Sequence, residues 1–397
     1  MLAHLSSRDP SFPDNLLKAA MHPDPYPYYA ALLAHRPIYR EENIGLWVAL
    51  GADAVTAVLE SPLCRVRPAG EPVPVNIAGS SAGDVFGNLA RMNDGERHAD
   101  LKPAITAAVG AFEAGAMIGT ARRVAAKCLQ EFGTGATGVD RFARAFPVRV
   151  IAEMIGLPAE AAPEAPALIA DFTRCLSPLS SAAQIEDSKS AARRLLELLE
   201  EHAGQRQRGG FAMRLERLMS LGVAQRDAAL ANLFGLMSQT YEATAGLIGN
   251  TLLALSRDAD LRRQAAGDDA LLRRIVPEVL RHDPPVHNTR RYVAEDGIVA
   301  GQPMKAGDTI LVMLAAANRD PALHVQPHRF DPERADKSCF TFGHGRHACP
   351  GTRIATELAV TGVQALMACD VAFDDLSRAV RYAPSVNTRI PVFAGAS

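Results

Sequence analysis

Apolar residues recur with helical spacing along most of the chain. Such patterns cover approximately 97–110, 115–132, 147–156, 184–206, 224–257, 270–282 and 352–369. Alanine, leucine, glutamate and arginine fill these segments, and all four residue types favour helices. A mainly helical protein is therefore expected.

The segment 224–257 is the longest of these patterns and contains no proline. As a helix it would extend roughly 50 Å at about 1.5 Å per residue. Apolar residues surround much of its second half, and a helix that is apolar on nearly all sides lies inside a protein. We predict a long helix through the centre of the molecule.

A small β component is expected as well. Residues 37–50, PIYREENIGLWVAL, predict a β-hairpin with its turn near 42–45. Short strand-like pieces occur at about 291–299 and 309–314, in a stretch (287–350) that is otherwise rich in proline, histidine, arginine and aspartate. Neither an internal repeat nor a low-complexity linker interrupts the chain. We therefore expect one large domain over 1–397, mainly α with a small β component.

Composition narrows the class of protein. The chain has 397 residues, a formal net charge of -2 and 48% hydrophobic residues, which are globular values. The near-zero charge gives no support for nucleic-acid binding. Six scattered cysteines without a CxxC pair favour a reducing compartment. The longest apolar run, 310–317, is far too short for a membrane span. A soluble cytoplasmic protein is expected.

Residues 342–351, FGHGRHACPG, surround one thiol with glycine and histidine. Taken alone, Cys349 has several interpretations: an inert buried thiol, a zinc ligand together with His344 and His347, or a nucleophile with His347 as its base. A thiolate just before the helical pattern at 352 would be stabilised by the helix N-terminus. Gly343 and Gly345 would permit backbone angles that other residues disfavour.

The complete stretch resembles the heme-binding sequence FxxGxxxCxG of the cytochrome P450 family, with Phe342, Gly345, Cys349 and Gly351 in the defining positions. The resemblance implies the single-domain cytochrome P450 fold, with the long central helix over the heme. It also implies heme b as cofactor and Cys349 as the axial thiolate ligand of its iron. Phe342, Gly343 and Gly351 would then shape the heme-binding loop.

A second motif supports the resemblance. Glu278 and Arg281, in PEVLRHDPP, are similar to the family's ExxR pair, which belongs to a buried ionic network. Arg329, in PHRFDPER, would be the third member of that network. We assign these three residues a structural role, because a buried network loses much stability when one partner is removed.

Cations are needed for the heme propionates. His98 and Lys102, in ERHADLK, are similar to the family's HxxxR pair, with lysine in place of arginine. The lysine keeps the charge but lacks the bidentate fork. Arg291 matches the family's arginine before the "ED" strand, although alternation along a strand leaves Arg290 as a competitor. His347 completes the expected set.

The central helix departs from the family pattern at residues 239–244, QTYEAT. Glu242 keeps the expected acid, but Ala243 occupies the place of the proton-delivering threonine. Thr244, one step further on, is turned by about 100° and is no simple substitute. The missing hydroxyl could come from Thr240 one turn earlier, from the substrate, or from a water that Gln239 orients.

The resemblance also implies a substrate pocket. We expect it to be lined by residues of the central helix and of the loop after ExxR; they are Gln239, Ala243, Thr244, Val286 and His287. The polar groups among them favour a small hydrophobic or partly oxygenated substrate.

Three functions follow from these residues. The first is a monomeric heme-thiolate monooxygenase of specialised metabolism, with electrons from a ferredoxin and its reductase, which would dock near Arg346 and Arg353. The second is a peroxide-driven or oxidative-coupling enzyme that uses the altered 239–244 segment. The third is a heme-thiolate sensor or ligand-binding protein. The retained Glu242 favours an enzyme, with Glu242 and Thr240 as its catalytic residues.

Overall fold

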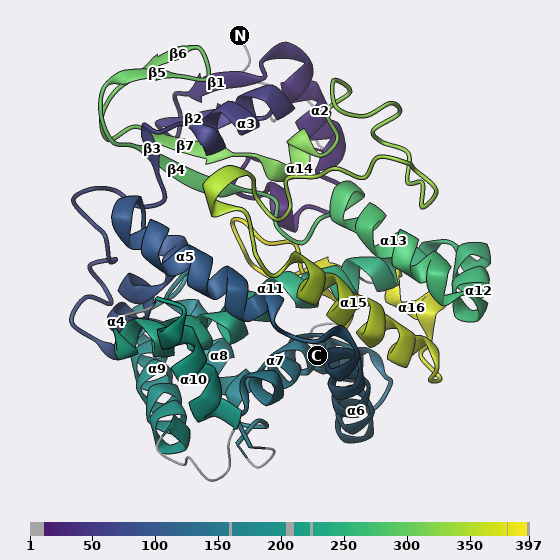
Figure 1. Ribbon diagram of the computed structural model, residues 1–397. Helices are drawn as coiled ribbons and strands as arrows, with labels where there is room; N and C mark the ends of the chain where they lie inside the picture. The colour runs from purple at the N-terminus through teal and green to yellow at the C-terminus, as the bar shows by residue number, and fades with distance from the viewer. Residues whose placement is uncertain (1–11, 159–160, 204–209, 223–224, 379, 395–397) are drawn as a thin grey trace. The chain divides into compact units, whose positions relative to one another are not determined.

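The structure is a computed structural model that describes residues 12–158, 161–203, 210–222, 225–378 and 380–394. Helices dominate it and the strands form small sheets, as the sequence predicts (Figure 1). The chain divides into two compact units. One unit takes its described residues from Met1–Ala69, Gly246–Cys349 and Val371–Ser397, and the other from Gly70–Ala245 and Pro350–Asp370.

The helices lie along the chain in the following order: α2 (Tyr26–His35), α3 (Ala52–Glu60), α4 (Ser81–Asn88), α5 (Gly95–Gly110), α6 (Ala114–Phe132), α7 (Ala136–Ile155), α8 (Ala165–Arg174), α9 (Ala182–Ala203), α10 (Gly210–Ser220), α11 (Arg226–Arg257), α12 (Ala259–Gly267), α13 (Asp269–His282), α14 (Leu314–Ala317), α15 (Thr352–Met367) and α16 (Phe373–Leu376). Short 3₁₀ helices are η1 (Ala19–Met21), η2 (Ala90–Met92) and η4 (Gly345–His347). The strands are β1 (Ile38–Glu41), β2 (Leu46–Ala49), β3 (Cys64–Arg65), β4 (Thr289–Val293), β5 (Gly297–Val299), β6 (Gln302–Met304), β7 (Thr309–Val312), β8 (Arg381–Tyr382) and β9 (Pro391–Val392).

The first unit is built on a five-stranded sheet with the order β1-β2-β7-β4-β3 (Figure 1). Strands β1 and β2 form the predicted hairpin, and β2 runs parallel to β7. Strand β7 alternates its side chains between two cores, as the two-residue period of a strand requires. Ile310 and Val312 pack in a cluster with α3 residues, whereas Leu311 and Met313 pack with α2 residues. The sheet is thus covered by helices on both faces.

The second unit is an assembly of helices. Helix α6 packs against α7 and α15, and α8 packs against α9. The part of α11 in this unit is held by Asn232, whose amide nitrogen donates to the Asn88 carbonyl at 2.9 Å and whose oxygen accepts from the Ala90 amide at 3.0 Å. The ring of Phe234 packs edge-on against Phe172 of α8. These contacts fix the helix that carries residues 239–244.

Most of the predicted helices are confirmed, with small shifts at their ends. Residues 204–206 and 224, at the ends of two predicted helices, lie outside the described residues. The helix predicted to begin at 147 was placed wrongly, because α7 begins at Ala136 and carries Pro147 in its interior. Its buried face, which includes Phe142 and Phe146, outweighs the one hydrogen bond that proline removes.

No single helix among the residues described above is long and apolar enough to cross a membrane. Helices α5 and α6 pass that test only as a pair, by length and composition, and they meet at a bend of 75°.

Candidate active site

Cys349 lies at the end of a closed loop, residues 340–349. The Gly343 amide donates to the Phe340 carbonyl at 2.7 Å, and the Cys349 amide donates to the Phe342 carbonyl at 2.8 Å. Gly343 and Gly345 have φ angles of +73° and +65°, a left-handed region that strongly favours glycine. Gly343 and Gly345 therefore adopt backbone angles that other residues disfavour, as predicted, and these angles let the loop close through its own backbone.

The thiol of Cys349 is accessible. It is exposed and forms no disulfide, whereas Cys64, Cys128 and Cys175 are buried. Burial raises the pKa of each of those three buried thiols. Since the thiolate is the form that binds metals, Cys349 is better suited as a ligand than the three buried cysteines.

A zinc site is not formed around this loop. Within the part of the chain that the structure describes, no group of three or more His, Cys, Asp or Glu side chains is gathered as a metal site. His344 instead pairs with Glu60 of α3, with 2.8 Å between Nε2 and Oε1. The zinc interpretation of His344, His347 and Cys349 therefore finds no support.

Two arginines beside Cys349 bind backbone carbonyl groups within their own units. Nη2 of Arg346 donates to the carbonyls of Ser61 at 3.1 Å and Cys64 at 2.7 Å. Nη2 of Arg353, at the start of α15, donates to the carbonyl of Phe112 at 2.7 Å. We had expected both side chains only as positive charge for a partner protein, and each also holds a neighbouring segment in place.

The expected propionate cations are placed in both units. On β4, Arg291 is buried and Arg290 is half-buried. On α5, His98 is buried and Lys102, one turn later, is half-buried. His347 is half-buried in η4. Their contact with a heme remains a prediction.

The ExxR residues form a buried ion pair. Arg281 and Glu278 are both 0% exposed, and the guanidinium donates from Nε and Nη2 to the two carboxylate oxygens at 2.9 and 2.7 Å. Nη1 of Arg281 also donates to the carbonyl of Pro327 at 2.8 Å, and Nη2 to that of Arg329 at 3.0 Å. The pair is therefore well supplied with hydrogen bonds.

The third member of this network is not the side chain we predicted. The guanidinium of Arg329 is 65% exposed, and only its backbone carbonyl contacts Arg281. The side chain that approaches Glu278 is that of Arg334, 11% exposed, with 3.6 Å between Nε and Oε1. The assignment of the Arg329 side chain is corrected, because the backbone turns that side chain towards solvent while Arg334 follows on the buried side.

Sequence reasoning missed Asn318, which joins the ExxR helix to the cysteine loop. Its amide nitrogen donates to the Leu280 carbonyl at 3.2 Å and to Thr341 Oγ1 at 2.9 Å. Its oxygen accepts from the Phe340 amide at 2.6 Å. The Thr341 hydroxyl donates to the Leu280 carbonyl at 2.6 Å. The start of the loop is therefore attached to α13. No sequence motif marks Asn318, so its role is visible only in the three-dimensional structure.

Helix α11 carries one accessible stripe on its otherwise buried middle section. Gln239 is exposed, and Thr240 and Ala243 are half-buried. Ala243 follows the other two by about one turn and therefore shares their face of the helix. Glu242 is half-buried beside them. Thr244 is 1% exposed, so its hydroxyl does not face this accessible stripe, and its predicted place in the pocket is corrected.

Hydrogen bonds to the helix backbone fix two polar side chains of the stripe. The Thr240 hydroxyl donates to the Leu236 carbonyl at 2.7 Å. Gln239 Nε2 donates to the Gly235 carbonyl at 2.9 Å. A Cβ on Gly235 would lie 3.0 Å from that Nε2 and 2.6 Å from a methyl of Leu89, so a larger residue there would have to push these two side chains aside.

His287 lies in a buried polar cluster, and its predicted place in the substrate pocket is wrong. The side chain is 0% exposed, and its Nδ1 lies 2.9 Å from the Tyr29 hydroxyl. Tyr26 packs on it as well and donates to Asp283, which also pairs with Arg389 at 2.9 Å. Val286, the residue before it, is half-buried against the α3 side of the sheet. Tyr26 and Tyr29, so distant in sequence, could not be foreseen as partners.

The cluster makes stability depend on pH. Burial, with the nearby charge of Arg389, lowers the pKa of His287 to about 3, against about 6.5 in an unfolded chain. The contribution of the neutral, buried His287 to the unfolding free energy is fully present above pH 6.5. As the pH falls from 6.5 towards 3, the unfolded state takes up a proton that the folded state does not, and each such group costs up to about 1.4 kcal/mol per pH unit.

Replacing His287 with asparagine should therefore flatten the dependence of unfolding free energy on pH between about 6.5 and 4.5. His282, whose pKa is also lowered to about 3 by burial and by the Arg319 charge, keeps its share of the slope. Urea unfolding at several pH values measures the effect. The exposed His35 offers a matched control, and His35→Asn should leave the slope unchanged. An unaltered slope in His287→Asn would contradict the assignment.

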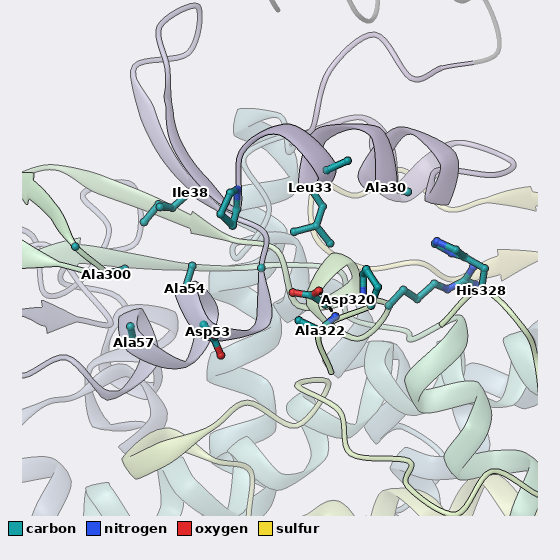
Figure 2. Close-up of a pocket in the computed structure, with 16 residues that line it drawn as sticks. Ala30, Leu33, Ile38, Asp53, Ala54, Ala57, Ala300, Asp320, Ala322 and His328 are labelled. Carbon is teal, nitrogen blue, oxygen red and sulfur yellow. Dashed lines mark hydrogen bonds between the residues drawn. The ribbon is translucent and has the colours of Figure 1, made fainter. Parts of the chain in front are cut away.

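A surface hollow of about 850 Å³ lies elsewhere in the first unit (Figure 2). Small apolar residues of α2 and α3, such as Ala30, Leu33 and Ala54, form much of its wall. The Asp320 carboxylate, at its edge, accepts from the Ala52 amide at 2.8 Å. Its lining includes none of the residues that the sequence predicted for cofactor or substrate, so it is not the predicted site.

Comparisons with known proteins bear on this geometry. A family model described as cytochrome P450 matches residues 227–377. The chain is 29% identical over 378 residues to cytochrome P450 monooxygenase PikC of Streptomyces venezuelae, covering 87% of this chain and 83% of that protein. It is 26% identical over 354 residues to 6-deoxyerythronolide B hydroxylase of Saccharopolyspora erythraea, covering 85% and 86%.

The fold also resembles that of a solved structure. The structure of P450 RauA, complexed with a biosynthetic intermediate of aurachin RE, matches with a TM-score of 0.78 at 22% identity and covers 98% of each chain. The family match includes both the ion pair of α13 and the loop of Cys349, and the relatives extend the likeness over most of the sequence. The chain therefore belongs to the cytochrome P450 family of heme-dependent oxidoreductases.

Proposed function

We propose that the protein is a heme-thiolate monooxygenase that acts on a small hydrophobic or partly oxygenated molecule. One atom of O2 enters the substrate, and the other leaves as water after two protons and two electrons have been supplied. The accessible thiol of Cys349, on a loop closed by its own backbone, is the observation that carries this proposal.

The residues of the chain suit heme b. Bound through a thiolate, heme activates dioxygen, because electron donation from sulfur favours cleavage of the O–O bond. Cys349 would supply the sulfur, and Phe342, Gly343 and Gly351 the loop around it. Arg291 would hold a propionate from the first unit, and its burial on β4 supports that role.

Three further side chains with donor groups would suit the propionates. These are His98, Lys102 and His347, which are buried or half-buried. Partial burial would strengthen the attraction between the Lys102 ammonium group and an anionic group, because the local dielectric is lower than in water.

The accessible stripe of α11 would serve proton delivery. Glu242 is its acid and would exchange protons with solvent. The Thr240 hydroxyl already donates its proton to Leu236, so it acts as a hydrogen-bond acceptor for a water or a substrate hydroxyl. Ala243, on the same face, leaves space for that group. A substrate hydroxyl or an ordered water would therefore replace the missing threonine.

A peroxide-driven or oxidative-coupling reaction is the second candidate. The engaged proton of Thr240 favours it, because the stripe then offers no hydroxyl of its own as a donor. Product formed with peroxide but without a reductase, at a rate exceeding the reductase-supported rate, would select this alternative.

Electrons would come from a ferredoxin and its reductase. Exposed arginines beside the cysteine loop, Arg346 and Arg353, support docking of an acidic partner. We also propose that the protein is a monomer and that it acts in the cytoplasm, where cysteines stay reduced. Specialised metabolite biosynthesis is the proposed setting.

The decisive experiment is a spectral titration of the purified ferric protein with terpenoids, fatty acids, macrolide precursors and aromatic amides. A fitting ligand displaces iron-bound water and moves the Soret band to shorter wavelength. A shift with one class would name the substrate class. A Soret band without thiolate character in the ligand-free protein would refute the proposed function altogether.

Ala243→Thr should raise the dissociation constant of the ligand found in this titration by about tenfold. Loss of one hydrogen bond, or a steric clash of about 1.4 kcal/mol, would have this effect. The measurement is the dissociation constant from the Soret shift. Thr244→Val is the matched control, because Thr244 is buried off the accessible stripe. Unchanged affinity with more product per electron consumed would indicate that water, and no substrate group, occupies the space.

A further inference from the structure

Arg346 lies in the cysteine loop, where the proposed function gives it only a surface role in docking an acidic partner. It lies between Gly345, which has a left-handed backbone, and His347 in the short helix η4. Its Nη2 donates to two backbone carbonyls, those of Ser61 and Cys64, at 3.1 and 2.7 Å. One side chain therefore attaches the loop to a segment more than 280 residues earlier in the sequence.

The attached segment ends in a strand that pairs with the strand carrying Arg291. Cys64 and Arg65 form β3, which pairs antiparallel with β4 through Cys64↔Val293 and Arg65↔Tyr292. The Ala294 amide adds a hydrogen bond of 2.8 Å to the Leu63 carbonyl.

Arg291 lies next to this pairing on β4 and is itself buried. The path from Cys349 to Arg291 thus runs through Arg346, β3 and β4. All of its contacts lie within the first unit.

The pair of His344 and Glu60 runs beside Arg346 but is a weaker attachment. Both side chains are substantially exposed, 42% and 57%, and exposed ion pairs contribute little to stability. The Arg346 contacts differ because they reach two backbone carbonyls, and that of Cys64 belongs to the paired strand β3. Arg346 is therefore the stronger of the two connections.

We propose that Arg346 is a positioning residue that fixes the Cys349 sulfur relative to the Arg291 guanidinium. This proposal rests on the proposed function, in which these two groups hold the iron and one propionate of the same heme. Without Arg346, the loop would be held less firmly to the strand, and the thiolate would be displaced more readily from the metal.

Arg346→Gln tests the proposal, since glutamine keeps a polar side chain but is shorter and uncharged, so it should lose the bonds that Nη2 donates to the Ser61 and Cys64 carbonyls. Transfer of heme to apomyoglobin should become about tenfold faster, within the 10- to 100-fold effects typical of residues that support a metal ligand. The reduced carbon monoxide complex should convert faster to its thiolate-free form. Arg346→Lys should restore part of the loss.

Arg353→Gln is the matched control, because it removes the same charge close to Cys349 in sequence and also breaks one arginine–carbonyl bond. Heme transfer in Arg353→Gln should stay within about twofold of the wild type. Equal heme-transfer rates in the two glutamine variants would overturn the proposal and leave Arg346 as ordinary surface charge.

Hydrogen exchange in the holoenzyme supplies a readout that does not depend on the heme spectrum. Amides of residues 61–65 and their β4 partners should exchange faster in Arg346→Gln and not in Arg353→Gln. Unchanged exchange would also overturn the proposal. A wild-type protein without a thiolate spectrum would instead refute the proposed function, and faster exchange would then still establish the attachment itself.

Discussion

Replacement of Cys349 with serine is expected to abolish the thiolate spectrum and the monooxygenase activity together. The other ligand candidates in the loop are engaged differently: His344 pairs with Glu60, and His347 is half-buried in η4. Serine keeps the size of the side chain, but its hydroxyl is not ionised at neutral pH and donates little electron density. Loss of residues that merely support a metal ligand costs about 10- to 100-fold. Loss of the ligand itself should exceed that range.

The absorbance of the reduced carbon monoxide complex measures this change directly, because thiolate ligation gives it a characteristic long-wavelength band. Cys369→Ser is the control: Cys369 is a half-buried free thiol just after α15 and should keep the band. A serine variant at 349 that retained the thiolate band would show that another cysteine holds the iron. The main conclusion about the loop would then be wrong.

The sequence predicted this loop well because local chemistry determines it. Glycine is strongly favoured where the backbone takes positive φ, as at 343 and 345, so the spacing of these glycines carries the shape of the loop in the sequence itself. The long helix α11 was predictable for a similar reason, since a proline-free apolar pattern over many turns has few other solutions. Helices α3, α4, α8, α10 and α12, each of 8 to 11 residues, offered too few periods to be identified.

Side-chain partners were the part that sequence could not supply. Arg329 and Arg334 are both arginines in one irregular segment, and only the path of the backbone decides which one reaches Glu278. His287 follows a pocket-like motif, yet Tyr29 lies 258 positions away in the chain and draws it into the interior. Asn318 has no motif at all. Such contacts depend on tertiary placement, which periodicity and spacing do not encode.

The buried ion pair of α13 gives the largest stability effect that we expect. Arg281→Met should cost about 3–5 kcal/mol of unfolding free energy, because it leaves the Glu278 carboxylate buried without its partner. It also removes donors from the carbonyls of Pro327 and Arg329. Urea unfolding of the heme-loaded protein measures the loss. Should Arg281→Met fail to fold, Glu278→Gln provides the milder variant, since the amide oxygen can still accept from Arg281.

Arg329 and Arg334 make this test specific. Arg329→Gln should change the unfolding free energy by less than about 0.5 kcal/mol, because its guanidinium is exposed and its carbonyl contact is retained. Arg334→Gln should cost about 1–3 kcal/mol, because Arg334 is nearly buried beside Glu278 and donates to the carbonyls of Val325 and Gln326. A larger loss at 329 than at 334 would reverse the assignment. The order of the three losses thus follows burial, and the sequence motif alone would have placed Arg329 with Arg281.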